Sequence, residues 1–88
     1  MTDPLVSYRE EITAVDLELL EAANRRLDLV RRLHEYKVAE GLPLRDPSRE
    51  EALVRDLRQH NAGPLSDDGV GELFRFVLDL TRKELHGA

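Results

Sequence analysis

The 88-residue chain has no cysteine and no tryptophan, and only four of its residues are aromatic. Without cysteine the fold has neither disulfides nor thiolate metal ligands, so packing alone must hold the core. The scarcity of aromatic rings and the formal net charge of −5 argue against a nucleic-acid-binding protein, which needs positive potential and usually stacks bases on aromatic side chains. These absences still allow a small anionic ligand.

Long hydrophobic runs are missing as well. No stretch approaches the roughly 20 apolar residues of a membrane span, and the first eight residues have neither the basic nor the apolar region of a secretory signal. We therefore expect a cytoplasmic protein without a membrane partner. The length of 88 residues predicts one domain, residues 1–88.

Proline and glycine are scarce, with four and five residues respectively, and their positions divide the chain into three helical segments. An Asp-Pro pair, which combines a helix cap with proline at the first helical position, occurs at Asp3 and again at Asp46. Gly41 ends the first segment, and Ser66 caps the third. No apolar alternation of period two predicts a strand. The sequence therefore predicts an all-α fold of three helices, at about residues 4–40, 47–60 and 67–85.

The first predicted helix is too long for the rest of the chain to cover. Its apolar residues recur at alternating steps of three and four, as in the seam of a coiled coil, from Leu5 and Tyr8 to Leu33 and Tyr36. At about 1.5 Å per residue this helix is about 55 Å long, whereas a compact chain of this size has a radius of gyration of about 12 Å. We therefore predict a homodimer in which the two long helices pair.

Several cations of this helix stand in unexpected places. Arg26 lies where the seam calls for an apolar side chain, and Lys37 lies three turns further along the same face. Arg9 is too far from Arg26 to share a small ligand with it in one chain, but an antiparallel partner helix could bring its own N-terminal end to that place. Each cation also has an ordinary explanation. Arg26 suits a snorkelling or register-setting role, and Lys37 suits a last-turn cation that complements the helix dipole.

A second group of charges opens the second predicted helix, where free backbone N–H groups favour an anion. In isolation its aspartate is a helix cap and the others are ordinary exposed residues. The three histidines lack the spacing of a metal site, and the chain has no glycine-rich phosphate loop. We expect neither a metal nor a cofactor, so any catalysis must come from preorganised charge. The members of this group are Arg45, Asp46, Arg49 and Glu50.

The chain carries a series of short motifs whose order and spacing are more informative than any one of them. These are Tyr8-Arg9-Glu10-Glu11-Ile12 with Asp16, Arg25-Arg26, Lys37 with Gly41 and Pro43, Arg45-Asp46-Pro47-Ser48-Arg49-Glu50, and Leu73-Phe74 with Thr81. Over nearly the whole chain they resemble the all-helical class of chorismate mutases. The resemblance implies an intertwined homodimer of three-helix chains that converts chorismate to prephenate, a step in phenylalanine and tyrosine biosynthesis.

That reaction explains why such a site needs cations and no nucleophile. A Claisen rearrangement is pericyclic, so the enzyme holds a flexible dianion in its compact conformer and stabilises charge on the breaking ether oxygen. By resemblance, Arg26 and Arg9 of the partner subunit clamp the two carboxylates. The resemblance makes Lys37, Arg26 and Glu50 the catalytic residues, facing the ether oxygen, a carboxylate and the substrate hydroxyl. Its further substrate contacts are the Asp46 backbone, Arg49, which orients Glu50 or lines the pocket, and Thr81, which matches a carboxylate-binding serine.

One position departs from the family pattern. Four residues after Thr81, where many members have a glutamine or glutamate that donates to the ether oxygen, this chain has Leu85. Losing such a donor costs on the order of 3 kcal/mol, roughly a hundredfold in rate. Three explanations are open: Glu84 substitutes as a protonated donor at low pH, a partner reorganises the tail, or the substrate is a relative of chorismate. The partner would be the first enzyme of the shikimate pathway, with which some short family members form complexes.

Three other functions also stay open. The same fold serves 4-amino-4-deoxychorismate mutases and isochorismate pyruvate lyases. Glu50 suits an amine as well as a hydroxyl, whereas the loop at residues 41–45 lacks the lysine that such lyases usually carry. The third is a catalytically silent helical dimer that regulates a partner, which only Leu85 favours.

Overall fold

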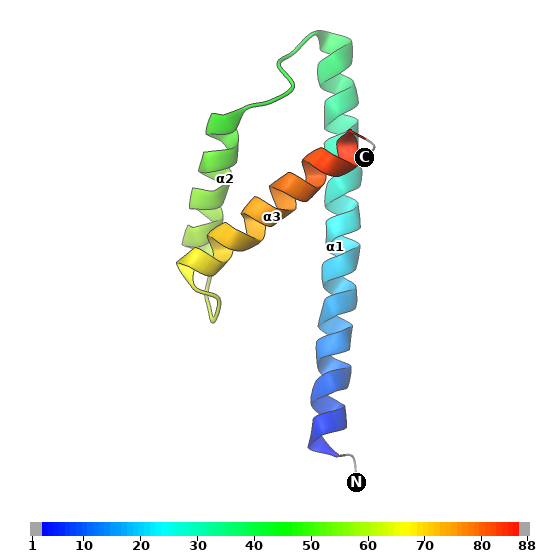
Figure 1. Ribbon diagram of the computed structural model, residues 1–88, viewed down its shortest axis with the longest axis vertical. Coiled ribbons are helices and arrows are strands. Elements are labelled where there is room, and N and C mark those ends of the chain that lie inside the picture. Colours follow the sequence, from blue (N-terminus) through cyan, green and yellow to red (C-terminus); the bar gives the residue numbers. More distant parts are fainter. Residues whose placement is uncertain (1–2, 87–88) are drawn as a thin grey trace.

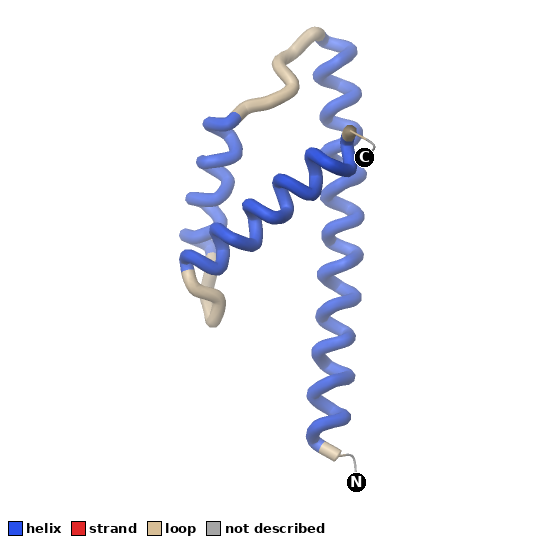
Figure 2. The backbone as a smooth tube through the Cα atoms, viewed as in Figure 1, coloured by secondary structure: helices blue, strands red, loops and turns tan. Residues whose placement is uncertain are grey.

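The computed structural model describes residues 3–86, which form three α-helices: α1 (Pro4–Glu40), α2 (Pro47–His60) and α3 (Asp67–Leu85). Figure 1 shows α1 as one long rod and α3 as a diagonal that runs from the far end of α2 back to α1. The tube in Figure 2 is helical except at the two connections and the ends of the described chain. The all-α class with one very long first helix, predicted from the sequence, is confirmed.

Each helix begins at a side chain that caps it. The Asp3 carboxylate accepts a hydrogen bond from the backbone N–H two residues on at 3.0 Å, and Asp46 accepts one from the N–H three residues on at 3.1 Å. The Ser66 hydroxyl does the same for α3 at 3.0 Å. These bonds satisfy donors that the first turn leaves without partners. At the other end of α1, Gly41 adopts a left-handed φ of 66°, which lets the next backbone N–H return to the Lys37 carbonyl at 2.9 Å.

Helix α3 holds the chain together, because it packs on both of the other helices. Within residues 3–86, α1 and α2 do not pack against each other. Val70 and Gly71, near the start of α3, are buried. The Arg58 side chain of α2 lies against Gly71, at the place where a Cβ atom would otherwise be, and its Nε donates to the Asp67 carbonyl at 3.1 Å. A small residue at position 71 therefore lets the α2 and α3 ends approach closely.

The chain leaves most of its apolar surface uncovered. Among the described residues Val70, at 4% exposure, is the one buried apolar side chain, whereas Tyr8, Ile12 and Leu19 on α1 are 59–66% exposed. The accessible surface is 7516 Å², against about 5,300 Å² for a compact monomer of this mass. The radius of gyration is 16.7 Å and the longest dimension is 60 Å. One chain thus forms its helices without closing a core around them.

None of the helices within residues 3–86 is at once long enough and apolar enough to cross a membrane.

Candidate active site

The contact between Arg26 of α1 and Thr81 of α3 is the first element of the site. Arg26 Nη1 donates to Thr81 Oγ1 at 2.9 Å, and the Thr81 hydroxyl donates to the Val77 carbonyl at 2.7 Å. Because its proton is committed to Val77, the Thr81 oxygen presents its lone pairs to the guanidinium. The seam cation is therefore held by α3 and keeps most of its five N–H donors for another partner.

These two side chains border a hollow of 420 Å³ between α1 and α3. Its other polar members are Asn24 and Glu84, and the surrounding walls are apolar, which strengthens the field of a charge held among them. The apolar walls come from Leu19, Leu20, Ala22, Ala23 and Leu27 of α1 and from Leu73, Phe74, Val77 and Leu80 of α3.

Glu50, in the first turn of α2, forms the second element. Its Oε1 accepts from Arg82 Nη1 at 2.8 Å, and Arg82 Nη2 also donates to Asp79 Oδ1 at 2.6 Å. Glu50 and Arg82 are only 28% and 34% exposed, so this ion pair is partly shielded from solvent. It ties the start of α2 to the last turns of α3.

Arg82 contacts a candidate site residue, Glu50, and the sequence pattern did not indicate this contact. The spacing of Asp79 and Arg82 indicates a local pair on one helix face. Glu50, however, is 32 positions away along the chain, and no helical periodicity connects residues on two different helices. Only the packing of α3 on α2 brings the Arg82 guanidinium to Glu50.

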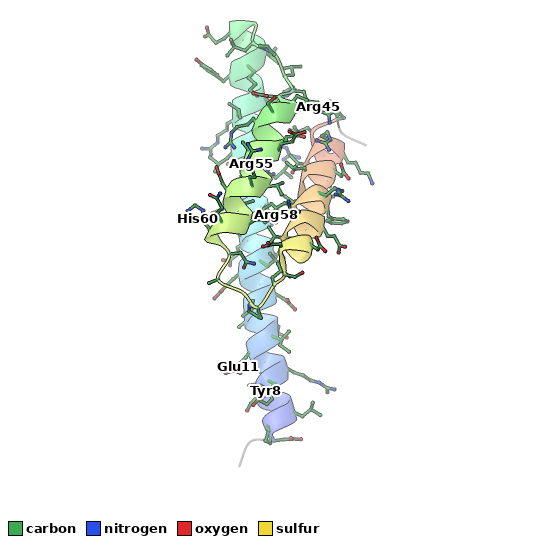
Figure 3. All side chains as sticks on the ribbon, turned by 90° about the vertical axis from the view of Figure 1, so that its left-hand side faces the viewer. Tyr8, Glu11, Arg45, Arg55, Arg58 and His60 are labelled. Carbon is green, nitrogen blue, oxygen red and sulfur yellow. The ribbon has the colours of Figure 1, made fainter. Side chains whose placement is uncertain are left out.

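A second hollow, of 510 Å³, lies between α2 and α3 and is strongly basic. Glu50 and Glu51 are its two acids. In Figure 3, where α2 and α3 lie in front of α1, the labelled Arg45, Arg55 and Arg58 are all seen along α2 and the loop before it. The chain is acidic as a whole, yet Glu50 stands beside a concentration of positive charge. The five arginines that line this hollow are Arg45, Arg55, Arg58, Arg75 and Arg82.

The remaining predicted site residues differ in how far the chain gathers them. Lys37 is half-buried in the last turn of α1, and Leu85 is half-buried at the end of α3. Asp46 and Arg49 are exposed, and the Asp46 carboxylate caps α2. Arg9 is exposed on the N-terminal stretch of α1, which extends past α2 and α3 in Figure 1. It lies about 26 Å along the helix from Arg26, so this chain does not bring the two together.

The comparisons with known proteins agree with one another. A family model described as chorismate mutase type II matches residues 8–85. This chain belongs to the chorismate mutase type II family. The resemblance that the sequence motifs indicated is thereby confirmed.

Within this family, solved structures and curated relatives are similar to the chain to different extents. Form II of the chorismate mutase from Thermus thermophilus matches with a TM-score of 0.90 at 27% identity, covering 97% of both chains. The bifunctional chorismate mutase/prephenate dehydratase of Neisseria gonorrhoeae is 36% identical over 74 residues, which are 84% of this chain and 20% of that protein. The 4-amino-4-deoxychorismate mutase of Streptomyces pristinaespiralis is 33% identical over 73 residues, 83% of this chain and 54% of that protein. The chain therefore spans about a fifth of the first relative and about half of the second.

Taken together, this chorismate mutase fold presents cations held by hydrogen bonds, one anchored carboxylate and apolar walls. Within residues 3–86 there is no cluster of three or more histidine or acidic side chains able to hold a metal ion. The contacts between Arg26 and Thr81 and between Glu50 and Arg82 fix two side chains before any ligand arrives. The Arg26 guanidinium, in the hollow between α1 and α3, can bind a carboxylate, and the Glu50 carboxylate, in the hollow between α2 and α3, can accept from a hydrogen-bond donor.

Proposed function

We propose that this protein is a chorismate mutase, an isomerase that converts chorismate to prephenate by an intramolecular Claisen rearrangement in aromatic amino-acid biosynthesis. The observation that carries the proposal is the hydrogen bond from Arg26 to Thr81, which holds a cation of the α1 seam in place. Family membership supports the same reaction. Because the rearrangement needs no nucleophile and no proton transfer, preorganised charge is sufficient catalysis.

The proposed roles follow from where the side chains are held. Arg26 uses one N–H on Thr81 and offers others to a substrate carboxylate as a bidentate clamp. Lys37, on the same helix, faces the breaking ether oxygen. Glu50 accepts from the substrate hydroxyl through Oε2, since Arg82 occupies Oε1. These three residues are the proposed catalytic groups.

The outer contacts of the proposed site come from residues that the chain leaves exposed or half-buried. Because the Asp46 carboxylate is committed to the helix cap, its backbone is the part that faces the substrate. Arg49 is exposed and lines the pocket, whereas the cation that contacts Glu50 is Arg82. Leu85 occupies the place of the second ether-oxygen donor, so we expect slower catalysis than in members that have glutamine or glutamate there.

We also propose that the working unit is a homodimer with two shared sites. The uncovered seam of α1 supports this, as does an accessible surface roughly 2,200 Å² larger than a compact monomer of this mass would have. Arg9 supports it too, because only a second chain running antiparallel can bring that residue to Arg26. Arg9 of the partner subunit then completes the carboxylate clamp.

The remaining expectations belong to this proposal. A single domain over residues 1–88 is supported by the family match to residues 8–85. A cytoplasmic location, expected from the first residues and the lack of long apolar runs, stays a prediction, as does complex formation with the first shikimate-pathway enzyme, which follows from the resemblance. Such a complex would compensate for Leu85 by reorganising the end of α3.

A second candidate substrate is 4-amino-4-deoxychorismate, on the same fold. Two 4-amino-4-deoxychorismate mutases, from Streptomyces pristinaespiralis and Streptomyces venezuelae, are 33% and 38% identical to this chain. Glu50 is an acceptor that an amine donor also fits.

The direct test follows the loss of chorismate absorbance with purified protein. Arg26→Ala should lower kcat/KM about 10²- to 10³-fold, as expected for removing a charged donor at the reacting group. Arg25→Ala is the matched control, because Arg25 is the exposed neighbour on the same helix and should change the rate little. No turnover of chorismate, or turnover that Arg26→Ala leaves unchanged, contradicts the proposal. Absence of turnover would favour the silent regulatory dimer or, if pyruvate is released from isochorismate, the lyase.

A further inference from the structure

The ion pair between Glu50 and Arg82 bears on which substrate the proposed site prefers. Arg82 is fixed from two sides: Nη1 contacts Glu50 at 2.8 Å and Nη2 contacts Asp79 at 2.6 Å. Asp79 lies on the same helix, three residues earlier, so it orients the guanidinium, which donates its other N–H group to Glu50. The contact therefore belongs to the folded chain and does not await a ligand.

A carboxylate with a fixed cation differs chemically from a carboxylate on its own. Alone, Glu50 would attract an ammonium group more than a neutral hydroxyl, because the ammonium adds a charge interaction to the hydrogen bond. Arg82 lies between two carboxylates, Glu50 and Asp79, so the three side chains together carry one net negative charge; Asp79 is 56% exposed and is not among the residues that line the hollow. On the side of the hollow, Glu50 and Arg82 therefore offset each other's charge, and the capacity of Glu50 to accept a hydrogen bond remains. A hydroxyl uses that capacity fully.

The surroundings of the pair reinforce this difference. The hollow that Glu50 and Arg82 border is lined by four further arginines and by one further acid, Glu51. An amine that carries a proton near neutral pH would approach Glu50 against this field, whereas a neutral hydroxyl would not.

We propose that Arg82 is a specificity-determining positioning residue: by neutralising and orienting Glu50, it makes the site prefer a hydroxyl-bearing substrate over its amine-bearing analogue. The inference rests on the proposed function and names the substrate of that same site, chorismate as opposed to 4-amino-4-deoxychorismate. Arg82 acts through Glu50 and does not itself contact the substrate.

A purely structural role for Arg82 has a different signature. As a strut between α2 and α3, Arg82 would affect both substrates equally when removed, because a displaced α2 harms every ligand of the site. A ratio of two kcat/KM values cancels such a common loss. The ratio for chorismate over 4-amino-4-deoxychorismate is therefore the readout.

The experiment measures this ratio for the dimeric wild-type protein, Arg82→Gln, Arg82→Lys and Lys83→Gln near neutral pH. Lys83→Gln is the matched control, since it removes the same charge from the adjacent, exposed position of α3. We expect the wild type to prefer chorismate and Arg82→Gln to lower the ratio about fivefold, the size of one partly exposed charge interaction. Arg82→Lys keeps the charge and should keep the ratio while lowering both rates. Lys83→Gln should leave the ratio unchanged.

Each alternative outcome has a definite meaning. A wild-type preference for the amine, an Arg82→Gln ratio within about twofold of wild type, or an equal shift in Lys83→Gln overturns the specificity role and leaves the mutase function standing. No turnover of chorismate by the wild type overturns the proposed function itself, whether or not the amine analogue reacts. Circular dichroism melting checks that the variants fold, and Arg82→Met, which keeps the apolar stem, takes the place of Arg82→Gln if that variant does not.

Discussion

The two ends of this molecule differ in how much of their structure one chain completes. Around α3, side chains from all three helices meet: Arg26 contacts Thr81, Glu50 contacts Arg82, and Arg58 contacts the Asp67 carbonyl. Along α1 before Arg26, the hydrogen bonds and ion pairs given by the described residues are all local to the helix. Figure 3 shows Tyr8 and Glu11 on this stretch, beyond the reach of α2 and α3.

The contrast teaches that forming a helix and burying it are separate events. The N-terminal stretch of α1 has a capped start and a continuous helical pattern, so it is helical, but within residues 3–86 its apolar seam from Tyr8 to Val15 stays 59–66% exposed. Helices in proteins gain most of their stability from tertiary packing of their apolar face. We therefore expect the two ends to respond differently to substitution.

The largest expected effect is on catalysis. It shows whether the exposed N-terminal stretch of α1, which carries Arg9, completes the site of a second chain. Arg9→Ala and Arg26→Ala should each lower kcat/KM about 10²- to 10³-fold. After subunit exchange in an equal mixture, about a quarter of the sites pair an intact Arg26 with an intact Arg9 from the other chain. About a quarter of wild-type chorismate turnover should return. No recovery in a mixture that contains heterodimers would place both residues in the same chain's site.

A charged side chain in the apolar seam of α1 should prevent the N-terminal stretch of that helix from pairing with a second chain. Ile12→Glu should produce monomers and lower the free energy of unfolding by about 3 kcal/mol, because it leaves an unpaired charge in the helix pairing. Sedimentation equilibrium and urea unfolding measure both effects. Ala14→Glu places the same charge on another face of the helix and should remain dimeric. A stable, folded 10 kDa monomer in the wild type at low micromolar concentration would refute the dimer.

Substitutions at the end of α3 test which residue there lies at the place of the second ether-oxygen donor. Leu85→Gln should raise kcat about tenfold by supplying the second donor to the ether oxygen. Glu84→Gln is the companion variant, since Glu84 borders the hollow that contains Arg26. If Glu84→Gln alone gives the increase, Glu84 and not Leu85 occupies the donor's place. If neither variant changes kcat, the ether oxygen lies away from this end of α3.

The smallest effect concerns the cap of α3. Ser66→Ala removes the hydroxyl that accepts from the Gly69 N–H and should cost about 1 kcal/mol of stability. Ser48→Ala, on the exposed first turn of α2, removes a hydroxyl that caps no helix and should cost much less. Equal losses in thermal unfolding would mean that the Ser66 cap contributes nothing specific.

Much of the candidate site could be predicted from the sequence, because its residues form motifs with regular spacing on single helices. Helical geometry alone places Arg26 and Lys37 on one face of α1. The Asp46 cap marks the start of α2 and so places the charged residues around it at that helix end. Thr81 was reached through resemblance, and the structure then showed its contact with Arg26. Arg82 was not reached, because its partner Glu50 lies on another helix and the pairing depends on how α3 crosses α2.

The linear pattern of residues is enough to predict the three helices, their capped starts and the exposed apolar seam of α1. These features depend on interactions across at most a few residues, which a linear pattern records. Three contacts come from the tertiary structure alone: Arg82 pairs with Glu50, Arg26 donates to Thr81, and Arg58 packs against Gly71. Those contacts join residues on different helices, and their geometry depends on the packing angle between helices, which no local spacing specifies.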